Sequence, residues 1–239
     1  MQYTIESGVD AAFKEPYESY MLGKCGADQV PGPRDIRNGI LHNYRPWEYA
    51  QAFRHGAFAA GDVVLDTGAM HTYFCIYLAQ FVQRLHATDS FYWANRDYLR
   101  KQKLFTPEEW MGYVAGKGGG KIACEEADLM GLRYPDATFD KVLCISTIEH
   151  VLDDAKAMCE LARVLKTGGR LLLTTEFSFH VGKAYSETDN SYYRVYTTKT
   201  LDALIAHSGL RPAGPVVVQN RNWIYLRKHV NAFVCLEKG

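Results

Sequence analysis

Carboxylates and a glycine stand where apolar stretches of this chain end. Residues 63–68 read VVLDTG, so Asp66 and Gly68 close one apolar stretch, and Asp89 closes the next one, at 84–89. A carboxylate at the end of the second strand of an α/β sheet can accept hydrogen bonds from both hydroxyls of an adenosine ribose. We therefore predict a nucleoside-binding site built from these strand ends.

The segment after the first apolar stretch contains a single glycine. Over residues 68–73 it reads Gly-Ala-Met-His-Thr-Tyr, with Met70 and Tyr73 where a dinucleotide site carries further glycines. Those glycines let the backbone approach a pyrophosphate at a helix N-terminus. The pattern favours a nucleoside cofactor without a pyrophosphate over NAD, and an NAD-dependent oxidoreductase is the second interpretation.

Strand patterns alternate with helix patterns from residue 61 onward. Such alternation is typical of a mostly parallel sheet covered on both faces, and the last two strand patterns are too close for a helix between them. We predict an α/β fold, a doubly wound, mostly parallel, seven-stranded Rossmann-like sheet with an antiparallel C-terminal strand hairpin. The predicted strands cover 63–68, 84–89, 121–128, 140–147, 170–177, 215–220 and 229–238, and the predicted helices 74–82, 106–114, 153–166 and 197–210.

Five sequence motifs follow one another in a fixed order between residues 60 and 239. They are VVLDTGAM, the acid in ATDS, EEADLMGLRYPDATFDKV, CISTIEHV and ELARVLKTGGRLLLTTE. Together they resemble the class I S-adenosylmethionine-dependent methyltransferases, the type 11 group in particular. The chain departs from that pattern at Met70 and Thr72, which replace the second and third glycines of the first motif, and at Thr167, where proline is common.

The resemblance implies S-adenosylmethionine as the cofactor and assigns roles to strand-end residues. Its methionine portion would lie against Asp66, Gly68, Ala69 and Ser146, and its ribose against Asp89. Its adenine would lie against Ser90, Phe91, Asp128 and Leu129. We divide the chain into an N-terminal helical substrate or lid segment, 1–60, and a methyltransferase domain, 61–239, with an insertion around 91–120.

Transfer of a methyl group to a hydroxyl requires a base that accepts the proton of that hydroxyl. His150 follows the fourth strand, where an acceptor would enter, and its ordinary pKa near 6.5 suits proton removal. We predict His150 as the catalytic base, followed by His180, Glu176 and Tyr193. A capping or substrate-orienting role for Glu149 and His150 is the alternative.

Two segments outside the cofactor motifs are rich in aromatic and polar residues. They are NYRPWEYAQAF at 43–53, which includes Glu48, and SETDNSYYRVYTTKTL at 186–201. The aromatic side chains could pack flanking helices or contact a sugar, and both segments resemble methyltransferases of glycan and surface-polysaccharide pathways. We predict O-methylation of a sugar or another small polar acceptor, bound by Arg45, Trp47, His180, Tyr193 and Arg194. A natural-product methyltransferase acting on a phenol or carboxylate, or a non-catalytic cofactor-binding homologue, is the alternative.

The composition argues against several other classes of protein. Lys and Arg together number 27, as do Asp and Glu, so the formal net charge is zero and no basic excess indicates a nucleic-acid partner. No apolar run is long enough to span a membrane, and no signal peptide or metal-ligand spacing is evident. We predict a cytoplasmic protein without a metal, and the sequence indicates no oligomeric state.

Overall fold

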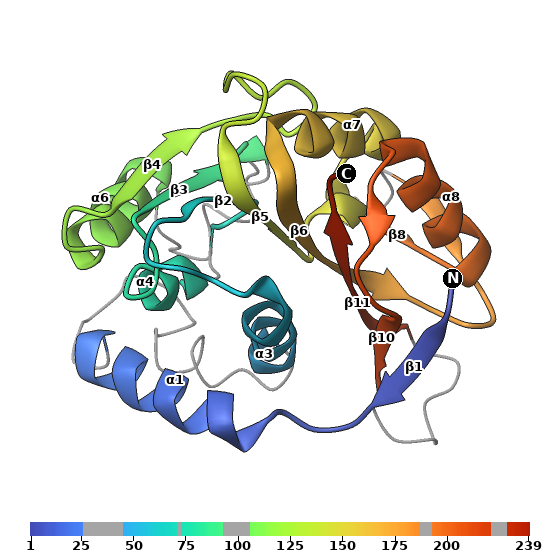
Figure 1. Ribbon diagram of the computed structural model, residues 1–239, viewed down its shortest axis with the longest axis horizontal. Helices are drawn as coiled ribbons and strands as arrows, with labels where there is room; N and C mark the ends of the chain where they lie inside the picture. The colour runs from blue at the N-terminus through green and yellow to red at the C-terminus, as the bar shows by residue number, and fades with distance from the viewer. Residues whose placement is uncertain (26–44, 71–72, 93–105, 187–192, 221–228) are drawn as a thin grey trace.

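A nine-stranded sheet organises the computed structural model, which describes residues 1–25, 45–70, 73–92, 106–186, 193–220 and 229–239 (Figure 1). The strand order is β1-β10-β11-β6-β5-β2-β3-β4, with β9 paired to β11. The strands are β1 (Tyr3–Glu6), β2 (Val63–Thr67), β3 (Arg84–Asp89), β4 (Ile122–Glu126), β5 (Phe139–Ile145), β6 (Leu165–Phe177), β9 (Arg211–Pro212), β10 (Val216–Gln219) and β11 (Val230–Glu237). A separate two-stranded sheet pairs β7 (Lys183–Ser186) with β8 (Tyr193–Val195).

The predicted fold class is confirmed. Strands β6, β5, β2, β3 and β4 pair in parallel, and β11 pairs antiparallel with both β6 and β10, as expected for the C-terminal hairpin. All seven predicted strands are present, and β1 and β9 add to them. Strand β1 is only four residues long, and its pairing with β10, more than two hundred positions away, leaves no local signal in the sequence.

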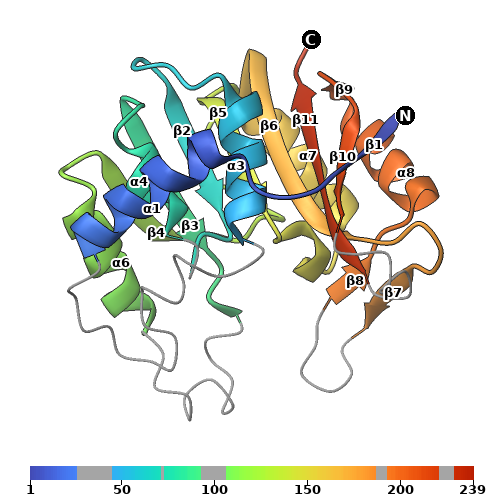
Figure 2. The same ribbon diagram turned by 90° about the horizontal axis from the view of Figure 1, so that it is seen from below.

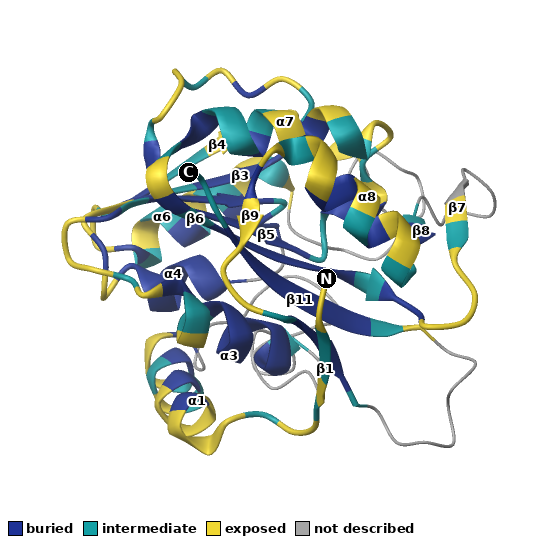
Figure 3. Ribbon diagram, turned by 45° about the vertical axis from the view of Figure 1, so that its right-hand side comes forward, coloured by how far each residue is buried: buried dark blue, intermediate teal, exposed yellow. Residues whose placement is uncertain are grey.

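Helices cover both faces of the large sheet (Figures 1 and 2). One face buries its apolar side chains under α1, α3, α4 and α6, and the other under α7 and α8. Figure 3 shows that α3 and α4 are buried over most of their surface, whereas α1 keeps an exposed side. The helices are α1 (Ala11–Cys25), α3 (Arg45–Gly56), α4 (Phe74–Leu78), α6 (Pro107–Lys117), α7 (Asp154–Val164) and α8 (Thr198–Ser208), with a short 3-10 helix, η2 (Ile148–His150).

Helix ends lie where the local sequence places them. Thr106 Oγ1 accepts a hydrogen bond from Glu109 N, and the Glu109 carboxylate accepts one from Thr106 N, with Pro107 as the first helical residue of α6. Thr197 caps α8 in the same way, and Gly209 ends it at φ 71°, a backbone conformation that favours glycine. The helix predicted at 106–114 thus begins at Pro107 and extends to Lys117, and the one predicted at 197–210 spans Thr198–Ser208.

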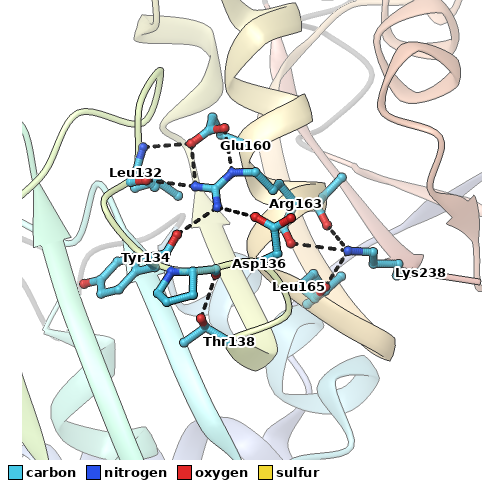
Figure 4. Close-up of polar contacts among 10 residues, drawn as sticks. Leu132, Tyr134, Asp136, Thr138, Glu160, Arg163, Leu165 and Lys238 are labelled. Atoms are coloured by element: carbon cyan, nitrogen blue, oxygen red, sulfur yellow. Dashed lines mark hydrogen bonds and ion pairs between the residues drawn. The ribbon is translucent and has the colours of Figure 1, made fainter.

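Arg163 on α7 holds the connection between β4 and β5 in place (Figure 4). Its guanidinium donates to Glu160 on the same helix, to the carbonyls of Leu132 and Tyr134, and to Asp136. Lys238 Nζ donates to the carbonyls of Ala162, Arg163 and Leu165 at the end of α7. The segment before β5 is thereby fixed against α7 at the edge where β5 and β6 begin, opposite the edge where the parallel strands end.

The N-terminal segment contributes to the core as well as to the sheet. Aromatic rings of α1 stack against those of α3 and α4, as between Tyr17, Tyr49 and Phe74, with Tyr49 and Phe74 ring centroids 4.5 Å apart. The proposed division at residue 60 and the insertion around 91–120 stay predictions, and residues 93–105 of that insertion lie outside the described residues.

Candidate active site

The site lies where the order of the parallel strands reverses. The chain passes from β2 to β3 on one side and reaches β5 on the other side of β2, so the carboxyl ends of β2 and β5 flank a crevice. Backbone contacts bring the strand ends together: Ala69 N donates to Thr88 O at 3.0 Å, and Thr147 Oγ1 donates to Thr67 O at 3.4 Å. The strand-end residues singled out in the sequence therefore lie around one edge of the sheet.

Asp66 is a buried carboxyl group with an unused acceptor. Its side chain is 2% exposed, and Oδ2 has no hydrogen-bond partner among the described residues. Burial and, to a smaller extent, the neighbouring Asp89 carboxylate raise its pKa to about 7. A buried acceptor without a donor is costly, so this position fits a ligand that carries a cationic donor, as the amino-acid portion of S-adenosylmethionine does.

Asp89 organises the loop after β2. Its Oδ2 accepts a hydrogen bond from Met70 N at 3.1 Å, and its Oδ1 accepts one from Phe91 N at 2.9 Å. Burial raises the pKa of Asp89, while these backbone donors lower it. Each carboxylate oxygen has a second lone pair, so the group could also accept hydrogen bonds from a ribose. Met70, which replaces a glycine of the family pattern, thus holds the loop to Asp89 through its backbone N–H.

Gly68 stands where the loop passes closest to the turn after β5. Its φ is 69°, and a Cβ at this position would overlap the side chain of Thr147. Both the backbone conformation and the close approach require glycine here. This is the one glycine of the family motif that the chain retains.

The residues predicted to contact adenine have different surroundings. Ser90 and Asp128 are exposed, and Asp128 Oδ1 accepts a hydrogen bond from Met130 N at 2.8 Å. Phe91 and Leu129 are buried, and the Phe91 ring packs against Trp110 with centroids 5.9 Å apart. Their contacts with a cofactor stay predictions, because hydrophobic packing and turn formation already account for these positions.

Glu48 on α3 joins the site from the N-terminal segment. It is 0% exposed and accepts hydrogen bonds from Ser146 Oγ and, at 2.7 Å, from Thr174 Oγ1. Ser146 has φ 44° and donates its backbone N–H to Thr174 Oγ1 at 2.9 Å. In the sequence, Glu48 stands out only as part of an aromatic segment. The structure shows that this charged residue lies within a buried stretch of α3, from Pro46 to Ala52.

Proton-accepting groups gather at the ends of β5 and β6. Glu176 Oε2 lies 3.0 Å from His229 Nε2, and burial raises the Glu176 pKa while His229 and His150 lower it. His150 is exposed on η2, with its ring 6.3 Å from that of Tyr193, which is 5.9 Å from His229. The structure thus brings together three predicted residues, His150, Glu176 and Tyr193, with His229, which the sequence analysis missed.

Glu149 is a buried carboxyl group next to these proton-accepting residues. It accepts a hydrogen bond from Thr175 Oγ1 at 3.0 Å. Burial raises its pKa to about 8, and the carboxylates of Glu176 and Glu48 also raise it. Glu149 is therefore largely protonated at neutral pH and adds little charge beside Glu176.

The predicted acceptor-binding residues do not form one surface. His180 is exposed, while Trp47 is fully buried in the core, where packing explains its apolar ring. Arg45 Nη1 lies 3.5 Å from Glu48 Oε2, so its guanidinium faces the buried carboxylate. Tyr193 lies beside His150, and the Lys183 ammonium is 4.0 Å from the Tyr193 ring centroid.

Arg194 braces the turn that carries Glu149 and His150. Its guanidinium donates to Leu152 O at 2.9 Å and to Ile148 O at 3.5 Å, and lies 2.8 Å from Asp154 Oδ2. The buried Arg194 side chain thus contacts the backbone on both sides of His150, a contact that spacing along the chain does not reveal. Its role as an acceptor ligand stays a prediction.

Comparisons with known proteins agree with this geometry. A family model described as a methyltransferase domain matches residues 65–173. The chain is 26% identical over 217 residues to a ubiquinone/menaquinone biosynthesis C-methyltransferase of Bdellovibrio bacteriovorus, covering 91% of this chain and 80% of that protein. It is 37% identical over 99 residues to the 27-O-demethylrifamycin SV methyltransferase of Amycolatopsis mediterranei, covering 39% of this chain and 35% of that protein.

A solved structure shares the fold over nearly the whole chain. The 1,6-didemethyltoxoflavin-N1-methyltransferase of Burkholderia thailandensis, crystallised with bound S-adenosylhomocysteine, superposes with a TM-score of 0.61 and 18% identity, covering 98% of this chain and 92% of that one. The methyltransferase domain matched over residues 65–173, together with these similarities, supports an S-adenosylmethionine-dependent methyltransferase with S-adenosylmethionine as the cofactor. None of these proteins is named for a sugar acceptor. Across the described ranges, no helix is both long and apolar enough to cross a membrane.

The raised pKa of Asp66 predicts a pH dependence of stability. Because its carboxyl binds a proton more tightly when folded, its contribution favours the folded state at low pH and is lost as pH rises from about 4 through about 7. Asp66→Asn should reduce the fall in unfolding free energy between pH 5 and 8 by about 1 kcal/mol or more. Urea denaturation across this pH range measures it, and an unchanged slope would contradict the assignment.

The brace formed by Arg194 predicts a local loosening on its removal. Arg194→Met removes the cation beside Asp154, which keeps its hydrogen bond from the Tyr196 hydroxyl, and removes the side-chain donor to Leu152 O, so the unfolding free energy should fall by about 2 kcal/mol or more. Amide hydrogen exchange over 148–152 should accelerate more than exchange in β2. Arg211→Met, at an exposed arginine of β9, is the matched control. Equal exchange in both variants would exclude the brace.

Proposed function

We propose that this protein transfers the methyl group of S-adenosylmethionine to a hydroxyl group of a small molecule. The observation that carries the proposal is the group of proton acceptors, Glu176 with His229 and His150, at the carboxyl ends of β5 and β6. A hydroxyl loses its proton as it attacks the methyl group, so a base within reach lowers the barrier. When bound, the cofactor supplies a methyl group already activated by its sulfonium.

The residues of the switch point would hold the cofactor. Asp66 would receive a hydrogen bond from the ammonium of the methionine portion, and Gly68 and Ala69 would let the backbone pass close to it. Asp89 would accept hydrogen bonds from the ribose while it keeps its bonds to the loop. Ser146 would line the methionine portion through its backbone, and Ser90, Phe91, Asp128 and Leu129 would surround the adenine.

The chain's own groups would also orient the acceptor and remove its proton. Glu176, which lies beside His229, would take the proton from the acceptor. His150, which is exposed on η2, would pass that proton to solvent. Arg194 would keep η2 in place. Glu149, with its raised pKa, would stay protonated and so leave Glu176 as the charged carboxylate of the pair.

Methylation at a ring carbon is the second candidate. The relative that covers 91% of this chain is named for C-methylation in quinone biosynthesis, whereas the rifamycin relative is named for an O-methyl group. A deprotonated phenol can react at its oxygen or at an adjacent ring carbon, so the same base would serve both reactions. Sugars, phenols and quinols are therefore the acceptors to compare.

Calorimetric titration with S-adenosylhomocysteine tests the cofactor site, with NADH as the control. We expect micromolar affinity for S-adenosylhomocysteine and no heat from NADH. Asp89→Asn should weaken the affinity by about tenfold, because the amide can no longer accept ribose hydrogen bonds at both positions. Binding of NADH alone would refute the proposal.

Loss of the proton acceptors should lower turnover without changing cofactor affinity. Glu176→Gln and His150→Ala should each lower kcat by about tenfold to a hundredfold, measured as S-adenosylhomocysteine released with sugar, phenol and quinol acceptors. His207→Ala, at an exposed histidine of α8, is the control. Turnover of His150→Ala within about threefold of the parent would remove His150 from the mechanism.

A further inference from the structure

A row of polar side chains crosses four neighbouring strands at the edge that carries the site. Glu6 on β1 pairs with Gln219 on β10, and Asn231 on β11 pairs with Glu176 on β6. The antiparallel register of β10 and β11, with Val217 opposite Phe233 and Val218 opposite Ala232, places Gln219 opposite Asn231. Residues paired in register share a face of the sheet, and here that face lies under α3 (Figure 1).

The middle of this row is buried and its hydrogen bonds are incomplete. Asn231 is 7% exposed, Gln219 is 8% exposed, and Gln51 of α3, which lies above the row, is 2% exposed. Gln51 Oε1, Gln219 Oε1 and Asn231 Nδ2 have no hydrogen-bond partner in the described part of the chain, and Glu176 Oε2 lies 3.0 Å from His229 Nε2. We call these four residues, Gln51, Gln219, Asn231 and Glu176, the polar row.

Fold stability does not explain the polar row. The neighbouring positions on this face are apolar: Val217 precedes Gln219 on β10, and Phe233 follows Asn231 on β11. Apolar side chains could therefore continue the core at Gln219 and Asn231. The Gln51 amide is half paired: its Nε2 donates to Glu6 Oε2 at 3.0 Å, while its Oε1 has no donor among the described residues. Buried polar atoms in native proteins are almost always hydrogen-bonded, and several unpaired ones in one place indicate a missing partner.

The missing partner must both donate and accept hydrogen bonds. The side-chain carbonyls of Gln51 and Gln219 need donors, while the Asn231 amide needs an acceptor. A hydroxyl group can donate and accept a hydrogen bond. It can therefore pair with the side-chain amides of Gln219 and Asn231 whichever way their oxygen and nitrogen atoms point. The row starts at Glu176, whose side chain is 29% exposed beside His229, and runs from there into the buried region.

We infer that the polar row binds hydroxyl groups of the methyl acceptor other than the one that is methylated. The inference rests on the proposed function and makes it more specific: the acceptor is a compound with several hydroxyl groups, bound with its reacting hydroxyl at Glu176. Gln219 and Asn231 are therefore specificity-determining residues. Selectivity follows because an acceptor without the additional hydroxyls leaves these buried groups unpaired.

The same reasoning predicts opposite effects on stability and on binding. Gln219→Met and Asn231→Leu replace unpaired polar groups by apolar ones of similar size. In the absence of acceptor, both variants should raise Tm, because they remove a desolvation cost that nothing offsets. Both should also lose the preference for hydroxyl-rich acceptors while they retain parent affinity for S-adenosylhomocysteine.

The test measures binding of myo-inositol and cyclohexanol, which share a carbon ring and differ in their hydroxyl groups. Binding is followed by thermal shift in the presence of saturating S-adenosylhomocysteine. The parent should bind myo-inositol at least about tenfold more tightly than cyclohexanol, and Asn231→Leu should bring the two within about threefold. Gln80→Met, the same substitution at an exposed glutamine after α4, is the matched control and should behave as the parent.

Each outcome decides the inference separately from the proposed function. Equal binding of the two probes by the parent would overturn it, as would a Tm lowered by Asn231→Leu, which would mean that a structural water pairs these atoms. If myo-inositol binds selectively and the variants abolish this, the polar row is a hydroxyl-binding site. Should S-adenosylhomocysteine then fail to bind, the proposed function alone would be wrong.

Discussion

The parallel pairing of β2 with β5 is the constraint on which the site depends. It places the loops after two central strands side by side, so that Gly68 passes against Thr147 where no side chain would fit. The backbone of the first loop is then tied to Asp89 at the end of β3. Each of these contacts crosses from one strand to the next, so the strand ends hold one another in place at the edge that carries the site.

Buried carboxyl groups are the electrostatic consequence of that architecture. Asp66 and Asp89 lie on one side of the site and Glu48, Glu149 and Glu176 on the other, and burial raises the pKa of Asp66 and Glu149 to about 7 and about 8. Raised pKa values reduce the number of negative charges that the core must hold. They also leave a site of partial negative charge, which suits a cofactor whose sulfonium and ammonium are both positive.

The polar row extends this picture toward acceptor selection. The family match covers residues 65–173, whereas Gln51, Gln219 and Asn231 all lie outside it, on α3, β10 and β11. In this proposal, cofactor binding and acceptor binding would use different parts of one sheet edge. Relatives named for transfer to carbon, oxygen and nitrogen can share the first part, while the second can differ among them.

The sequence by itself determined the strand and helix order, the C-terminal hairpin and the resemblance to methyltransferases, because hydrophobic periodicity and ordered motifs are local signals. It also placed Asp66, Gly68 and Asp89 at strand ends. The tertiary structure alone decided that Trp47 packs in the core and that Arg194 braces the turn at His150. It alone decided that Glu48, His229 and the polar row lie beside Glu176. Those positions depend on strand register and on the packing of α3 across the sheet, which join residues far apart in the chain and leave no periodic trace along it.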